Sequence, residues 1–432
     1  MRAARLASEG ASMGNAAAAC HPCADHSCGI GIAIRHILRS TGMACLLAAA
    51  AVGSVVHAQG DDLASERAAI ADSVAASADD AATAATTDTL ALAAPGISPR
   101  PMSVHIHLPP GYARDATTRY PVLYVNDGQD WDAVGVDATL AQLYRDGAIR
   151  PVIVVAIDMP PDRMGAYGLS DPGAHRSLVA NTRYGPVGAI ADAYSRWVVE
   201  QLVPHVDAHY RTRPDPADRT VLGWSLGALN AFNLGWQYPK VFGRVGAFSP
   251  SFWVSSERQD ATASLRTRLA QRMVDRSGKR VGARFWFAIG DSEDTDDRDG
   301  DGLNDAVDDL RDLILGYRAG DGFRTRGLAD LGYTTDMAAA EHAPRDAEVA
   351  YFLLRNGHHN QDAWKQMLPP FLAWAFGKAH PDHSTDPGGP PETPSSSLRT
   401  RKRFSTAPAG KPGVSASKPL GPRVRGGDVI SD

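Results

Sequence analysis

Short apolar runs alternate with polar-faced stretches through the middle of the chain. Seven of these runs predict strands, at residues 103–108, 121–126, 152–157, 219–222, 244–248, 284–289 and 350–354. Several are continuously apolar, as strands buried on both faces require. Because helical periodicity separates many of them, we predict an α/β fold with a mostly parallel central sheet covered by helices on both faces.

Two helices stand out between and after these strands. Residues 186–206 begin with Pro186, which suits a first helical turn, and carry apolar residues at helical spacing. Residues 362–376 show the same spacing, and Pro369 and Pro370 are expected to kink or restart that helix.

The two ends of the chain are poor in residues that build a core. Residues 59–95 are mostly Ala, Asp, Ser and Thr, and residues 379–432 are rich in Pro, Ser, Gly and basic residues. Both compositions are typical of disorder. We therefore predict one folded domain at 96–378, a disordered linker at 59–95 and a disordered tail at 379–432.

Residues 1–58 are predicted to be an N-terminal extension that ends in a secretory signal. Basic residues at 35 and 39 precede an apolar stretch at 43–56, and small residues lead to Ala58. That stretch is too short and too rich in alanine for a membrane span. Cleavage near Ala58 predicts a secreted or periplasmic protein without cysteine, because all four cysteines lie within the first 45 residues.

The charge balance gives no reason to expect a nucleic-acid partner. The chain has 44 Lys and Arg against 49 Asp and Glu, for a net charge of −5. We also expect no organic cofactor, and the sequence does not define an oligomeric state.

Residues 223–227 read Gly-Trp-Ser-Leu-Gly between a predicted strand and a helix-like run. This arrangement predicts a nucleophile elbow, a tight turn that exposes Ser225 to a general base. The glycines at 223 and 227 leave room for the turn.

A serine nucleophile needs a histidine and an acid, which follow it in that fold in the order serine, acid, histidine. His358 and His359 come directly after the last predicted strand, where the base belongs. Candidates for the acid are Glu293, Asp294 and, last, Asp291, in the loop that follows residues 284–289.

Developing negative charge on the substrate requires backbone N–H donors. We expect one donor from Leu226, the residue after the nucleophile. The second is expected from Gly128 or Gln129, in the loop after residues 121–126.

Four stretches resemble the putative esterase family of α/β-hydrolases, which includes esterase D, feruloyl, acetylxylan and enterochelin esterases and the mycolyltransferases. They are residues 108–112 (LPPGY), 120–129 (YPVLYVNDGQ), 202–212 (LVPHVDAHYRT) and 223–253. The resemblance covers about residues 103–376 and implies the α/β-hydrolase fold. Ala228 departs from it, since many relatives have glycine there.

The resemblance also favours one of the candidates for the base and one of the candidates for the acid. A histidine commonly stands five residues before a tryptophan in this family, and His359 has that spacing to Trp364 while His358 does not. Relatives place the acid three residues after the glycine that ends the strand, which favours Glu293. The long insertion after Gly290 weakens this second match.

An acidic segment within that insertion has the spacing of a calcium-binding loop. In the twelve residues 297–308, carboxylates occupy positions 1, 3, 5, 9 and 12 (Asp297, Asp299, Asp301, Asp305 and Asp308), with glycine at position 6 and the carbonyl of Leu303 at position 7. The segment resembles EF-hand and dockerin loops, although Asn304 replaces an aliphatic residue and the twelfth ligand is a short Asp. A structural calcium ion and a solvated acidic loop are the two interpretations.

Together these features predict a secreted serine esterase that acts through an acyl-enzyme on a small-molecule, glycan or siderophore-type ester. An acyltransferase with the same residues is one alternative. A calcium-dependent binding protein on an inactive hydrolase scaffold is another.

Overall fold

The computed structural model describes residues 84–258, 260–298, 300, 302–338 and 347–378. Residues up to Phe376 belong to one compact unit, and of the second unit, 377–432, only Gly377 and Lys378 are described. The predicted signal segment, the four cysteines and the predicted tail therefore lie outside the described residues.

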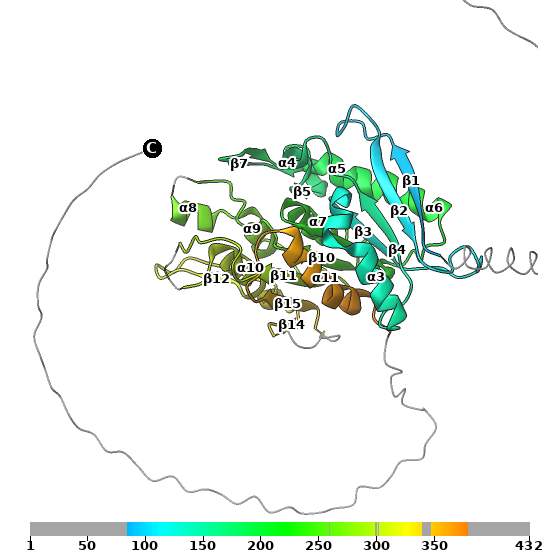
Figure 1. Cartoon of the computed structure of the whole chain (residues 1–432). Helices are drawn as coiled ribbons and strands as arrows, with labels where there is room; N and C mark the ends of the chain where they lie inside the picture. The colour runs from blue at the N-terminus through cyan, green and yellow to red at the C-terminus, as the bar shows by residue number, and fades with distance from the viewer. Residues whose placement is uncertain (1–83, 259, 299, 301, 339–346, 379–432) are drawn as a thin grey trace, which may run out of the picture. The chain divides into compact units, whose positions relative to one another are not determined.

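A nine-stranded sheet forms the centre of the described unit (Figure 1). Its strands, in spatial order, are β1 (Thr86–Leu92), β2 (Met102–Leu108), β4 (Ile153–Ile157), β3 (Val122–Asn126), β9 (Arg219–Trp224), β10 (Arg244–Phe248), β11 (Arg284–Gly290), β15 (Val349–Leu354) and β14 (Thr335–Asp336). All neighbours from β4 to β14 pair in parallel, and β2 pairs antiparallel with both β1 and β4. The predicted α/β fold and all seven predicted strands are confirmed.

Helices and short hairpins connect these strands. The helices are α2 (Trp131–Val134), α3 (Val136–Arg145), α4 (Arg163–Ala166), α5 (Ala191–Trp197), α6 (Val203–His209), α7 (Leu226–Gln237), α8 (Ala261–Arg266), α9 (Leu269–Asp275), α10 (Asp305–Leu315) and α11 (Gln361–Phe376). The hairpins are β5 (Leu169–Asp171) with β6 (Arg176–Leu178), β7 (Ala180–Thr182) with β8 (Gly185–Val187), and β12 (Tyr317–Arg318) with β13 (Arg324–Thr325). Within the described ranges no helix is long and apolar enough to cross a membrane.

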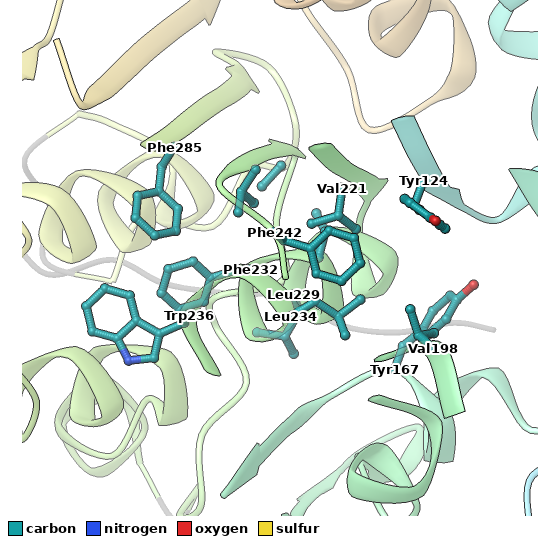
Figure 2. Packing of buried hydrophobic residues seen from close by; sticks show 14 of the residues in the cluster. Tyr124, Tyr167, Val198, Val221, Leu229, Phe232, Leu234, Trp236, Phe242 and Phe285 are labelled. Atoms are coloured by element: carbon teal, nitrogen blue, oxygen red, sulfur yellow. The ribbon is translucent and has the colours of Figure 1, made fainter. Parts of the chain in front are cut away.

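Alternate residues of each central strand enter two different cores, one on each face of the sheet. In β3, Val122 and Tyr124 pack into the core that contains α5 and α7, while Leu123 and Val125 pack into the core that contains α3 and α11. Figure 2 shows the first core, where Phe232 and other α7 side chains meet apolar residues of the strands. Burial on both faces explains why these strands are apolar throughout.

The predicted linker at 59–95 is wrong at its C-terminal end, because residues 86–92 form β1. This strand pairs along its whole length with β2, from Thr86 opposite Leu108 to Leu92 opposite Met102. Leu90 and Leu92 pack against the core. A polar, alanine-rich composition suggested disorder, but an edge strand gains its stability from the backbone ladder of its partner.

The helix predicted at 186–206 begins later than expected. Pro186 lies in β8, opposite Asn181, and α5 starts at Ala191. A π-helical turn, Val198–Leu202, then joins α5 to α6, whose second residue is Pro204. Because proline has no N–H to donate, a break from regular α-helical bonding at this point is expected. The helix predicted at 362–376 is confirmed as α11, which contains Pro369 and Pro370.

Gly246 in β10 offers a test of how tightly the sheet packs against α11. A Cβ added there would lie 2.4 Å from Phe371 Cε2 and 2.8 Å from Leu222 Cδ1. We expect Gly246→Ala to lower the free energy of unfolding by about 1–3 kcal/mol, because a well-packed core has no space for it. Urea denaturation measures this loss.

The matched control is Gly278→Ala, where no atom lies within 4 Å of the added Cβ. Its free energy of unfolding should stay close to that of the wild type. If Gly246→Ala and Gly278→Ala had the same free energy of unfolding, the close packing of Gly246 against Phe371 and Leu222 would be contradicted.

Candidate functional site

Ser225 occupies a sharp turn between β9 and α7. Its φ is +56° and its ψ −124°, a conformation that residues other than glycine rarely adopt. The turn is held by the bond from Ser225 N to Phe248 O (3.0 Å) and by Ser225 O, which accepts from Ala228 N (3.1 Å). The sequence prediction of a strand, an elbow and a helix around Ser225 agrees with this geometry.

The two glycines of the elbow allow its strand and helix to approach closely. A Cβ on Gly223 would lie 2.2 Å from Gly227 O, and a Cβ on Gly227 would lie 2.7 Å from Asp127 Oδ2. A side chain at position 223 would force the strand and helix of the elbow apart, and one at position 227 would displace the Asp127 carboxylate.

His359 lies between β15 and α11, within reach of the serine. Its Nε2 is 3.0 Å from Ser225 Oγ, and its Nδ1 is 2.7 Å from Glu293 Oε2. The His359 side chain is 40% exposed while that of Glu293 is 2% exposed, so the imidazole is accessible and its carboxylate partner is shielded. This is the geometry in which a carboxylate fixes the tautomer and orientation of a base.

Glu293 is held by two further donors, neither of which the sequence analysis identified. Gly290 N donates to Oε1 (2.9 Å), and the Ser249 hydroxyl donates a short hydrogen bond to the same oxygen. Ser249 Oγ in turn accepts from Trp364 Nε1 (3.0 Å). Trp364 also meets the His359 ring edge to face, at 5.6 Å between centroids. The histidine–tryptophan spacing noted in the sequence thus has a physical basis. Trp364 contacts the His359 ring, and it also donates to Ser249, which in turn donates to Glu293.

The alternative residues have other partners. His358 Nδ1 bonds Ser292 O at 2.7 Å, a backbone carbonyl of the loop after β11. Asp291 Oδ1 accepts from Asn356 N at 2.7 Å. Burial, together with the nearby Asp296 and Asp305 carboxylates, raises the pKa of Asp294. The geometry therefore favours Glu293 and His359 over the other candidates.

Two glycines bring the acid and the base together. Strands β11 and β15 pair in parallel, with Gly290 opposite Leu354. A Cβ on Gly290 would lie 2.1 Å from Gly357 O, and Ser292 N donates to that carbonyl at 3.0 Å. This backbone contact places the loop after β11 against the loop after β15.

The predicted oxyanion donors lie on adjacent segments. Leu226 is the first residue of α7, and Gly128 and Gln129 begin a 3-10 turn, η1 (Gly128–Asp130), directly after β3. Strands β3 and β9 are parallel neighbours, so these segments leave the same edge of the sheet. The Gln129 side-chain oxygen accepts from Met159 N (2.9 Å).

The acidic loop at 297–308 is described except for Asp299 and Asp301. Asp297 accepts from Gly300 N (2.8 Å) and Gly302 N (3.1 Å), and both glycines have positive φ. Asp305 begins α10 and its carboxylate pairs with Arg298 (3.0 Å). Among the described residues no group of three or more potential metal ligands is present.

A cavity of about 730 Å³ lies beside the residue that follows Glu293. Its lining includes Tyr184 at the tip of the β7–β8 hairpin, Trp253, Arg258 and Asp294. Trp131, by contrast, is buried and stacks on His107 at 3.6 Å, so it is a core residue.

Comparison with known proteins places the chain in a family. A model of the family described as "Putative esterase" matches residues 97–375. An endo-1,4-beta-xylanase/feruloyl esterase of Xylanibacter ruminicola is 26% identical over 171 residues, 37% of this chain and 21% of that protein. The uncharacterized protein YbbA of Bacillus subtilis is 26% identical over 148 residues, 34% of this chain and 56% of that protein. The chain thus spans a fifth to just over half of the length of these relatives.

Among solved structures, the enterobactin esterase FES of Shigella flexneri aligns with a TM-score of 0.46 at 18% identity, over 67% of this chain and 58% of that one. A ferulic acid esterase aligns with a TM-score of 0.44 at 15% identity, over 68% of this chain and 98% of that one. The family match is the decisive comparison, because it extends over more than half of the sequence. The chain therefore belongs to the Putative esterase family.

Proposed function

We propose that this protein is a serine hydrolase that cleaves a carboxylic ester through an acyl-enzyme intermediate. One observation carries the proposal: the continuous contact from Ser225 Oγ to His359 Nε2 (3.0 Å) and from His359 Nδ1 to Glu293 Oε2 (2.7 Å). A partly exposed hydroxyl, an accessible imidazole and a buried carboxylate in this order are the parts that acyl transfer requires.

In the first half of the reaction, Ser225 Oγ attacks the ester carbonyl carbon while His359 Nε2 takes the hydroxyl proton. The carbonyl π electrons move onto oxygen and form a tetrahedral oxyanion. When the intermediate collapses, the ester C–O bond breaks, His359 gives its proton to the leaving alcohol and the acyl group stays on Ser225. Water then attacks the acyl carbonyl carbon while His359 Nε2 takes a proton from the water. When this second tetrahedral intermediate collapses, the bond from the acyl carbon to Ser225 Oγ breaks, His359 returns the proton to Ser225 and the carboxylic acid is released.

The oxyanion would be bound by backbone N–H groups of Leu226 and of Gly128 or Gln129. Support comes from their positions on neighbouring segments at the edge where Ser225 lies. Glu293 would stabilise the imidazolium that forms during each proton transfer, and its 2% exposure keeps that interaction out of bulk water.

The substrate class follows less directly. We propose a small-molecule, glycan or siderophore-type ester. The cavity lined by Tyr184, Trp253 and Arg258 borders Asp294 and the acidic loop, and its lining does not include Ser225 or His359. The names of two similar proteins, a feruloyl esterase and an enterobactin esterase, describe enzymes that act on esters of these kinds.

An acyltransferase would use the same residues and would differ only in that an alcohol, instead of water, attacks the acyl-enzyme. An inactive binding protein is disfavoured because Ser225, His359 and Glu293 form one continuous chain of contacts.

The proposal predicts that Ser225→Ala abolishes ester hydrolysis without unfolding the protein. Loss of the nucleophile should lower kcat by about 10⁶-fold, which is the order seen for other serine hydrolases. Release of p-nitrophenol from short-chain and aromatic acyl esters measures the rate, and repeating it with added alcohols detects acyl transfer. Equal rates for wild type and Ser225→Ala would exclude a serine hydrolase.

A second prediction concerns the identity of the acid. Glu293→Gln should lower kcat by about 10⁴-fold, because the neutral amide neither fixes the tautomer nor stabilises the imidazolium. Asp294→Asn is the matched control, one residue away, and should change kcat by less than about tenfold. The assignment to Glu293 is wrong if the control loses more activity than Glu293→Gln.

The acidic loop is proposed to bind calcium in a structural role. The turns fit such a loop, since Asp297 accepts from two backbone N–H groups and α10 begins at position 9, Asp305. Ligands would come from Asp297, Asp299, Asp301, Asp308 and the Leu303 carbonyl. The pairing of Asp305 with Arg298 is compatible, because position 9 often binds through water. Bound calcium would order the segment that follows Glu293.

If calcium binds, its removal should lower the melting temperature. A ligand at 100 times its Kd stabilises the folded state by about 2.7 kcal/mol. Thermal unfolding followed by circular dichroism, with calcium or with a chelator, measures this difference. In Asp301→Asn the melting temperature should no longer depend on calcium, whereas in the surface control Asp321→Asn it should still do so. A wild-type melting temperature that does not change with the chelator would contradict calcium binding.

Export from the cytoplasm, with cleavage near Ala58, stays a prediction from the sequence. The predicted signal segment, within residues 1–58, lies outside the described residues.

A further inference from the structure

We propose that Arg163 is a positioning residue for the oxyanion hole. Through its ion pair with Asp127 it holds the turn formed by residues 127–129, which we call the β3 turn. The inference rests on the function proposed above, because the β3 turn matters for chemistry only if Gly128 or Gln129 binds the oxyanion.

The β3 turn starts with an unfavourable backbone conformation. Asp127 has φ +60° and ψ +50°, in the left-handed region that residues other than glycine seldom occupy. Such a conformation persists only where surrounding contacts hold it. It is also what directs the chain from β3 into the 3-10 turn that begins with Gly128.

The β3 turn has little freedom to move toward the sheet. A Cβ on Gly128 would lie 2.9 Å from Ala156 C and 3.0 Å from Ile157 N, so its backbone already packs against β4. Further contacts that hold the turn come from Asp127, through its side chain and its backbone N–H.

Two parallel hydrogen bonds join Asp127 to Arg163. Arg163 Nε lies 2.9 Å from Asp127 Oδ1 and Arg163 Nη2 lies 2.7 Å from Oδ2. The carboxylate is 1% exposed and the guanidinium 25% exposed. A planar fork of this kind restricts both distance and orientation, which a lysine ammonium cannot do.

The same short helix supplies a third contact to Asp127. Arg163 is the first residue of α4, which is capped by Asp162 through Gly165 N (2.8 Å). Tyr167, at the end of α4, accepts from Asp127 N at 3.1 Å, and its ring lies 5.2 Å from the Arg163 guanidinium carbon. Both the side chain and the backbone of Asp127 are thus fixed from α4.

The buried carboxylate also touches the nucleophile side of the site. A Cβ on Gly227 would lie 2.7 Å from Asp127 Oδ2, so this oxygen lies against the first turn of α7, directly after Leu226. Asn126 Nδ2 adds a bond to Gly227 O at 3.0 Å. The ion pair therefore sets the separation between the two segments that carry the candidate donors.

The charge on Asp127 depends on its partner. Burial raises the pKa of Asp127 and the nearby Asp130 charge adds to this, while the hydrogen bonds and charge of Arg163 and a hydrogen bond from the Gln129 side chain oppose it. Without Arg163 the carboxylate would be left buried beside the elbow with its main compensating charge removed. The β3 turn would then relax to hydrate or protonate it.

An ion pair that only stabilises the fold is the competing explanation, and the chain contains a matched control. Arg219 pairs with Asp207, with exposures of 8% and 25%. Arg219 is the first residue of β9, so this pair lies at the opposite end of the strand that leads to Ser225. Removing it should reduce stability without moving the oxyanion hole.

The experiment compares Arg163→Gln with Arg219→Gln in the full-length protein. Steady-state kinetics on p-nitrophenyl esters give kcat and KM, thermal unfolding gives stability, and inhibition by an alkylboronic acid reports tetrahedral adduct binding. Losing one oxyanion donor entirely costs about 10²–10³ in kcat. We expect Arg163→Gln to lower kcat by about 10- to 100-fold, with KM within about threefold and boronic acid affinity reduced in parallel. Arg219→Gln should change the melting temperature with kcat close to wild type.

Two further variants separate positioning from stability. Arg163→Lys keeps the charge but not the fork, and should recover stability more fully than kcat. The double variant Asp127→Asn with Arg163→Gln removes the buried charge, and should recover the melting temperature while kcat stays low. Full recovery of kcat in the double variant, or an unchanged kcat in Arg163→Gln, would overturn the inference.

Ser225→Ala in the same assay distinguishes this failure from a failure of the proposed function. If Ser225→Ala is inactive and Arg163→Gln is fully active, only the role of Arg163 is wrong. If Ser225→Ala is as active as the wild type, or the wild type has no esterase activity, the proposed function is wrong and the role of Arg163 is overturned with it.

Discussion

The parallel pairing of β3, β9, β10, β11 and β15 is the constraint on which the site depends. Parallel strands end at one edge of the sheet, and here each strand delivers one part of the site just beyond its last residues. Strand β9 delivers Ser225, β11 delivers Glu293 and β15 delivers His359. The burial of both faces of the sheet keeps these ends in register, because a shift of one residue would exchange the two cores.

Three adjacent strands end in residues with left-handed backbone conformations. Asp127 after β3, Ser225 after β9 and Ser249 after β10 have φ of +60°, +56° and +47°. Each turns the chain sharply, so that its side chain or the next N–H groups stay at the edge of the sheet. Conformational strain is tolerated at such positions when surrounding contacts determine them. Here those contacts are the Arg163 ion pair for Asp127 and the Glu293 and Trp364 bonds for Ser249.

One half of the site is shielded from solvent and the other half is accessible to it. Glu293, Ser249 and Trp364 form a hydrogen-bonded chain in which the carboxylate is nearly excluded from water. His359 bridges this chain to Ser225 and is partly exposed. The contact of Glu293 with the imidazole therefore lies at low local dielectric, while the proposed base, His359, is partly exposed.

Sequence alone predicted the strands and the elbow at Ser225, because apolar runs and glycine spacing reflect local backbone and burial requirements. The position of the oxyanion loop stays a prediction. The sequence narrowed the base and acid to His358 or His359 and to three carboxylates, and only a family resemblance favoured His359 and Glu293. Only the tertiary structure decided which residues meet. The Gly290–Gly357 contact, the Ser249–Trp364 hydrogen bond and the Arg163–Asp127 pair all join segments far apart in the chain. Such contacts depend on strand order and loop approach, and no local pattern of residues encodes them.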